Sequence, residues 1–152
     1  MLVDHFIAIS AELTGFSAEE LRATGMAGVY RAVVLERAGA ERLGRLEAAV
    51  TGAGDGPLGL DEEPERELAR AVAHLWYLGT WPGLRVPEDS KAQRLAGEPF
   101  VVSSRAYTEG LAWRTFHGNA PGTAAQGHGS WSTAPPAGAT RDADAAAPAE
   151  RR

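Results

Sequence analysis

Cysteine is absent from this chain of 152 residues, which excludes disulfides, thiolate metal sites and cysteine-ligated iron–sulfur clusters. Lysine is nearly absent: Lys91 is the single lysine, and the 15 basic residues are outnumbered by 20 acidic ones, for a net charge of −5. Without a basic patch, nucleic acid is not expected as a partner. No apolar run approaches the ~20 residues that a membrane-spanning helix needs, so we expect no direct membrane insertion.

Aromatic and branched aliphatic residues are missing from the C-terminal segment 133–152, TAPPAGATRDADAAAPAERR. Such a segment cannot bury enough apolar area to offset the conformational entropy lost on ordering. The sequence therefore predicts a disordered tail over 133–152 and a helical domain with a C-terminal arm over 1–132.

Apolar residues recur at helical spacing through the first third of the chain. This pattern predicts a helix from Leu2 to Leu13. Ser17 and Glu20 have the spacing of a capping box, which opens a short helical turn. A longer helix is expected from Met26 to Val50, with a disturbance at Gly39 because glycine is unfavourable inside helices. The residues that recur at helical spacing along it are Val29, Val33, Glu36 or Arg37, Leu43, Leu46 and Val50.

Glycine-rich residues 52–59 are interpreted as a loop, because no strand precedes them and no helix N-terminus follows as a phosphate-binding loop requires. Pro64 suits the first turn of a helix that runs to Leu78 and ends at Gly79 in a left-handed conformation. The expected inward-facing residues of this helix are Leu68, Ala71, Val72, Leu75 and Leu78.

The prolines within residues 80–100 predict a long irregular segment. Irregular segments of this length are usually functional or ordered by a partner. Ser103 or Ser104 then caps a helix that is expected to run through Phe116. No strand signal is convincing, and the apolar run 99–102 is too short to found a sheet. The predicted class is all-α: a small irregular helical bundle with extended loop and arm segments.

The polar side chains do not form a recognisable catalytic or metal-binding pattern. Ser104 and His117 could suggest nucleophilic catalysis, but no third orienting group is visible. His74 is interpreted as a structural, hydrogen-bonded histidine. We therefore predict no catalytic, cofactor-binding or metal-binding residue. None of the four histidines, His5, His74, His117 and His128, has metal-ligand spacing.

Aromatic residues gather instead near two helix ends and in a glycine-broken run over 110–131. Trp76 and Tyr77 are adjacent on a helix, so they point about 100° apart and cannot share one core face. An exposed Trp131 at the end of the run makes sense if a partner buries it, because aromatic residues supply much of the energy at interface hot spots. We therefore predict an interaction subunit. Its predicted partner-interface residues are Trp76, Trp81, Tyr107, Trp113, His117, Pro121, His128 and Trp131.

Three sequence elements resemble the small subunits of membrane-associated, FAD-dependent sugar and sugar-alcohol dehydrogenases of the sorbitol and fructose type. The resemblance extends over 68–131 and is fainter over 3–50. The first element is an aromatic helix end of the form Leu-Trp/Tyr-Tyr-Leu-Gly, the second is Tyr-x-x-x-Leu-x-Trp, and the third is Pro-Gly…Gly-x-Gly-x-Trp. The first element falls on residues 75–79, and the second falls on Tyr107, Leu111 and Trp113. The third element falls on Pro121, Gly122, Gly127, Gly129 and Trp131.

This resemblance implies a non-catalytic accessory subunit that stabilises or escorts a large FAD-dependent dehydrogenase subunit, often together with a cytochrome subunit. FAD is expected on the partner, because this chain has neither a dinucleotide fingerprint nor a haem-attachment motif.

Many such small subunits carry a twin-arginine export signal, whereas the Arg-Arg pair here is at 151–152. The chain is accordingly expected in the cytoplasm, or in the cell envelope after export with a partner. The alternatives are a stand-alone α-helical binding or regulatory protein, and a small enzyme built around His74 or His117.

Overall fold

The computed structural model describes residues 2–54, 60, 62–85, 94–118 and 120, all within a compact unit that comprises Met1–Pro121. These residues form an all-α fold with a very short two-stranded ladder, so the predicted fold class is confirmed. The predicted boundary at 132 and the tail beyond it lie outside the described residues. In chain order the elements are α1 (Leu2–Thr14), α2 (Ala18–Ala23), α3 (Ala27–Ala38), α4 (Ala40–Gly52), α5 (Glu63–Leu78), β1 (Thr80–Trp81), α6 (Arg94–Gly97), β2 (Phe100–Val101), α7 (Ser104–Thr108) and α8 (Leu111–Thr115).

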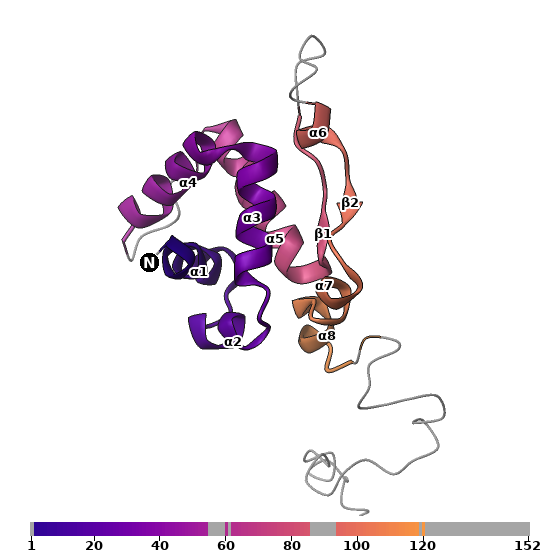
Figure 1. The fold of residues 1–152 in the computed structure, drawn as a ribbon. Helices are drawn as coiled ribbons and strands as arrows, with labels where there is room; N and C mark the ends of the chain where they lie inside the picture. Colours follow the sequence, from indigo (N-terminus) through magenta and orange to yellow (C-terminus); the bar gives the residue numbers. More distant parts are fainter. Residues whose placement is uncertain (1, 55–59, 61, 86–93, 119, 121–152) are drawn as a thin grey trace, which may run out of the picture. The chain divides into compact units, whose positions relative to one another are not determined.

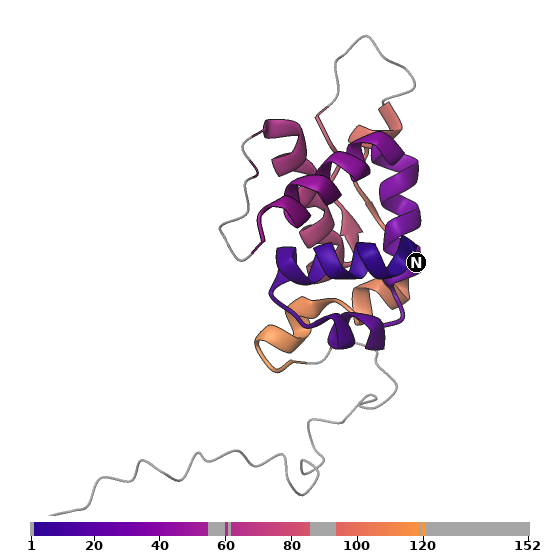
Figure 2. The same cartoon turned by 90° about the vertical axis from the view of Figure 1, so that its left-hand side faces the viewer.

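Helices α1, α3, α4 and α5 pack together, and we call these four helices the helical body (Figures 1 and 2). Its core consists of aliphatic side chains around two aromatic contacts. The Trp76 ring meets the Tyr30 ring edge-on at 5.0 Å and lies nearly parallel to Phe6 at 6.4 Å. Aromatic side chains supply large buried areas, so these three residues contribute strongly to the stability of the body.

The predicted helix boundaries are largely confirmed. Ser17 and Glu20 form the expected capping box, in which the Ser17 backbone N–H donates to the Glu20 carboxylate at 2.9 Å. Gly39 has a φ of 83° and divides the expected long helix into α3 and α4. Gly79 ends α5 in the left-handed conformation with φ 68° and ψ 20°.

One residue expected to face inward, Leu78, and one residue of the helical spacing pattern, Val29, are instead exposed. Val29 on α3 is 43% exposed and Leu78 at the end of α5 is 44% exposed. The neighbouring pattern positions Val33 and Leu75 are buried as expected. Both residues stand at the border of the apolar pattern of their helices, so they face outward while the neighbouring pattern positions are covered.

Described parts of the segment after α5 form short regular elements that the sequence did not indicate. Thr80 pairs with Val101 and Trp81 with Phe100 in an antiparallel ladder, which returns the chain beside α5 (Figure 1). Arg37 on α3 holds this returning segment, because its Nη1 donates to the Leu95 carbonyl at 2.6 Å and its guanidinium lies 4.5 Å from the centre of the Phe100 ring.

The last expected helix is also divided. Ser103 is its N-cap, with the hydroxyl accepting from the Ala106 N–H at 3.0 Å, but α7 ends at Thr108 and α8 begins at Leu111. Gly110 lies between them, where an added Cβ would stand 2.7 Å from the Tyr77 carbonyl oxygen. The break therefore lets the backbone approach the end of α5 closely, a contact that only glycine permits.

Candidate partner-binding surface

Trp76 and Trp81, two of the predicted interface residues, belong to the core of this chain. Trp76 is 1% exposed and Trp81 is fully buried. The Trp81 indole N–H donates to the Ala96 carbonyl at 2.9 Å, which satisfies the polar atom inside the protein. The prediction that these two side chains face a partner is therefore wrong, because the returning segment covers one of them and α1 and α3 cover the other.

Tyr77 also makes its contacts within the chain, on a different side of α5 from Trp76. Its hydroxyl donates to the Thr14 carbonyl at 2.8 Å, and its ring meets the Phe16 ring edge-on at 6.0 Å. The aromatic end of α5 is thus a structural element that ties α5 to the end of α1.

A different aromatic group lies at the surface of α7 and α8. The Trp113 ring meets Tyr107 edge-on at 5.5 Å and Phe116 at 5.6 Å. Tyr107 is 41% exposed, Phe116 is 60% exposed, and Trp113 is half-buried between them. We call these three residues the aromatic surface. The sequence predicted Tyr107 and Trp113 as interface residues, and the structure places them together.

Phe116 is a member of this surface that the sequence pattern did not single out. The signal that could have found it is its position three residues after Trp113, which places both rings on one side of a helix. The ring lies over Gly118, where an added Cβ would overlap it, so a larger residue there would displace this exposed ring.

The aromatic surface stands on a firmly attached support. At Gly79 an added Cβ would overlap the Ala106 carbonyl group, and the Tyr30 hydroxyl donates to the same carbonyl at 3.4 Å. Arg105 on α7 donates to the Thr24 carbonyl at 3.2 Å. The Trp113 indole N–H donates to the Tyr107 carbonyl at 2.9 Å, which fixes the ring itself. Trp113 therefore loses little side-chain freedom on binding, because its ring is already held in place.

The remaining predicted interface residues have different outcomes. His117 is exposed beside Phe116 and has a φ of 56°, which is uncommon for a residue other than glycine. Pro121, His128 and Trp131 lie outside the described residues. The role assigned to these three residues stays a prediction.

The structure supports the structural interpretation of His74. Its Nδ1 lies 3.1 Å from the Thr80 carbonyl oxygen and 3.0 Å from the Thr80 hydroxyl, at the point where α5 passes into β1. A protonated Nδ1 would donate to the carbonyl and an unprotonated Nδ1 would accept from the hydroxyl, so Thr80 provides a partner for either tautomer.

The described ranges contain neither a metal-binding cluster nor a membrane-spanning helix. Among the residues that the structure describes, no group of three or more histidine, aspartate and glutamate side chains could hold a metal ion. Among the helices with assigned positions, none is long and apolar enough to cross a membrane.

Among the residues with assigned positions, two ionisable groups have clearly shifted pKa values. Burial raises the pKa of the Tyr30 hydroxyl, with the Glu109 carboxylate adding to the effect. The backbone N–H and the hydroxyl of Ser17 lower the pKa of Glu20, and the Arg114 guanidinium on α8 lowers it further. Both shifts arise from structural contacts and neither group lies in the aromatic surface.

Comparisons of the chain with protein-family models, with curated proteins and with solved structures found no match.

Proposed function

We propose that this chain is a non-catalytic accessory subunit that binds a large FAD-dependent sugar or polyol dehydrogenase subunit through the aromatic surface. The proposed partner comes from the sequence resemblance, and the proposed mode of binding comes from Tyr107, Trp113 and Phe116. A single observation carries the mode of binding: three contacting aromatic rings are partly exposed on a support that is fixed to the helical body.

The chemistry of these rings favours a protein partner. Aromatic side chains bury large areas with few rotatable bonds, and Tyr and Trp also offer a polar atom at the rim. The arginines Arg105 and Arg114 lie on the same two helices, and both are exposed. A mixed aromatic and arginine surface has the composition that is enriched in protein interfaces.

The elements of the resemblance have separate roles in this interpretation. Leu75 and Trp76 of the first element form core contacts, while Gly79 seats α7 against the end of α5. In the second element Leu111 is buried, whereas Tyr107 and Trp113 face outward. The first element would thus build the support, and the second would present the side chains that bind.

The test is co-purification of this chain with a candidate large FAD-dependent subunit. Replacing Trp113 with Ala should weaken the complex by about 2 kcal/mol, or roughly thirtyfold, which is typical of an interface hot spot. Leu95→Ala is the matched control, because Leu95 is 55% exposed but lies on α6, away from the aromatic surface. Equal binding by both variants would contradict the proposed mode of binding.

The catalytic part of the proposal has its own measurement. The purified chain alone should show no flavin absorbance and no sugar oxidation with an artificial electron acceptor, whereas the complex should show both. Activity of the isolated chain would overturn the assignment as an accessory subunit. A complex that forms without any effect on flavin content or activity would overturn the dehydrogenase assignment but not the binding surface.

A further inference from the structure

The two-stranded ladder of β1 and β2 has one covered edge and one open edge. β1 lies between α5 and β2 (Figure 1), and no described element pairs with the far side of β2. On the covered edge, the Thr80 carbonyl oxygen lies 3.1 Å from the Nδ1 of His74, a residue of α5. An open strand edge carries unpaired N–H and C=O groups that can pair with another chain. The far side of β2 is therefore a candidate interaction surface.

The hydrogen bonds of the ladder show which backbone groups of β2 face this open edge. Val102 donates its N–H to the Gly79 carbonyl at 3.0 Å. Along an antiparallel ladder, pairs of residues that exchange hydrogen bonds alternate with pairs that do not. Val101 therefore belongs to a pair that does not, and its N–H and C=O are directed away from β1. Neither group has a partner among the described residues.

The neighbouring residues extend the open edge beyond β2. Ser103 has an extended backbone, with φ −168° and ψ 167°, so its N–H has the same direction as that of Val101. Pro99 directs its carbonyl to the same side, but proline has no N–H. Pro99, Val101 and Ser103 are all exposed, and Val101 is 60% exposed. The segment 99–103 thus presents an accessible strand.

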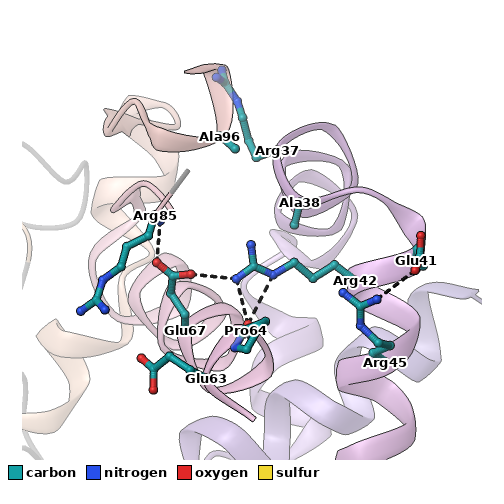
Figure 3. A pocket seen from close by; sticks show the side chains of 10 residues that line it. All are labelled: Arg37, Ala38, Glu41, Arg42, Arg45, Glu63, Pro64, Glu67, Arg85 and Ala96. Atoms are coloured by element: carbon teal, nitrogen blue, oxygen red, sulfur yellow. Dashed lines mark hydrogen bonds and ion pairs between the residues drawn. The ribbon is translucent and has the colours of Figure 1, made fainter. Parts of the chain in front are cut away.

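Contacts with the helical body hold this strand and its neighbour in place. After β1, the Arg85 N–H donates to Glu67 at 2.6 Å, and Arg42 holds the same carboxylate at 2.8 Å (Figure 3). Before β2, Arg37 donates to the Leu95 carbonyl at 2.6 Å. These contacts surround a pocket where α3, α4, α5 and α6 meet. A strand that is already positioned loses little conformational entropy when it pairs.

From this edge we infer that two copies of the chain pair through segment 99–103, antiparallel and with Val101 on the twofold axis. Each Val101 exchanges both of its backbone hydrogen bonds with Val101 of the other copy. Each Ser103 N–H donates to the Pro99 carbonyl of the other copy. The two Val101 side chains lie next to each other on one face of the extended sheet. This contact lies outside the aromatic surface and does not depend on the proposed dehydrogenase partner.

The groups at the two ends of the segment favour a second copy over an unrelated strand. In an antiparallel partner, the carbonyl opposite Pro99 receives no hydrogen bond, because proline has no N–H. The N–H opposite Ser103 meets a carbonyl that already accepts from the Tyr107 N–H at 3.1 Å. A second copy avoids both problems. It places the bonded carbonyl of its Ser103 opposite Pro99, and its own Pro99, without an N–H, opposite Ser103.

The experiment is sedimentation velocity of the full chain from micromolar to millimolar concentration. Small interfaces are weak, so the expected result is a reversible dimer whose fraction rises with concentration. Trp113→Ala should dimerise as the wild-type chain does, because Trp113 belongs to the aromatic surface. A chain that stays monomeric throughout this range would overturn the inference, and so would loss of the dimer in Trp113→Ala.

Val101→Pro and Val101→Thr form a matched pair for locating the contact. Proline removes the N–H at the centre of the pairing, whereas threonine keeps it together with a β-branched shape. One donor is lost from each copy, and each hydrogen bond contributes roughly fivefold, so Val101→Pro should dimerise about thirtyfold more weakly than Val101→Thr. Equal dimerisation by the two variants in folded form would contradict the inference.

Val101→Glu and Val101→Lys provide a second test if Val101→Pro does not fold. Each variant alone places like charges directly opposite each other, which should weaken its dimer about fivefold relative to the wild-type chain. An equimolar mixture of the two should form more dimer than either variant alone, because opposite charges then meet across the axis. Melting curves show whether each variant is folded. A mixture that dimerises no better than its components would overturn the inference.

Discussion

The aromatic end of α5 and the aromatic surface of α7 and α8 are both rich in aromatic residues but have opposite environments. Trp76 is enclosed by Phe6 and Tyr30, whereas Trp113 lies half-buried between two exposed rings. The difference arises from the coverage of each helix by other elements. The segment after α5 returns along that helix, while no described element covers the outer side of α8. Aromatic density alone therefore does not distinguish a core from a binding surface.

The largest expected effect separates the two tryptophans by stability. Trp76→Ala should lower the free energy of unfolding by about 3 to 5 kcal/mol, because it leaves a large cavity in the core. Trp113→Ala should lower it by only about 1 kcal/mol, since the Trp113 ring packs against side chains that are themselves partly exposed. Denaturant unfolding of both variants measures the difference. Similar losses of stability for the two would show that Trp113 also belongs to the core.

An intermediate effect is expected at the junction between the two regions. Gly79→Ala should destabilise the chain by about 3 kcal/mol, because a left-handed φ is strained for alanine and its Cβ would meet the Ala106 backbone. Gly15→Ala is the control. Gly15 also has a positive φ, of 76°, but no atom within 4 Å of an added Cβ, so it should lose only about 1 kcal/mol. An equal loss at both positions would mean that α7 is not seated on Gly79.

The smallest expected effect concerns the capping box of α2, whose Glu20 carboxylate is influenced by Arg114 on α8. The folded pKa of Glu20 is lowered from its usual value of 4.5, so the unfolded chain binds its proton first as the pH falls. The stabilising contribution is therefore fully present above pH 4.5 and is lost as the pH falls through the folded pKa. Glu20→Gln should lack this component.

Unfolding measured between about pH 7 and pH 3 tests the sign of this effect. The stability difference between the wild-type chain and Glu20→Gln should shrink toward the acidic end. A difference that grows as the pH falls would contradict the assignment of the capping interaction to the ionised carboxylate.

Local sequence signals predicted the helix ends well, because the relevant contacts are made within a few residues. The Ser17–Glu20 box, the break at Gly39 and the left-handed Gly79 are all of this kind. Gly110 carried no comparable local signal. Its importance depends on the Tyr77 carbonyl, which comes close only after α8 has packed against α5.

Long-range contacts also determine which of the predicted interface residues are buried. Trp81 is buried because the Ala96 carbonyl accepts its indole proton from 15 positions away, which no local pattern indicates. The two-residue ladder was not predicted either. Each strand is too short to show an alternating pattern, and its partner strand lies far away in the sequence. The pocket lined by Ala38, Arg42, Glu67 and Ala96 likewise brings together residues of α3, α4, α5 and α6, whose meeting depends on the packed structure.

The attachment of α7 to the earlier helices has a consequence for the order of folding. Its hydrogen bonds link residues far apart in sequence, with 76 positions between Tyr30 and Ala106 and 81 between Thr24 and Arg105. Closing loops of this length costs more entropy than the short connections between the first four helices. We expect α7 and α8 to dock late, which hydrogen exchange can test as earlier opening of their amides. The aromatic surface would then form only in molecules whose other helices have already folded.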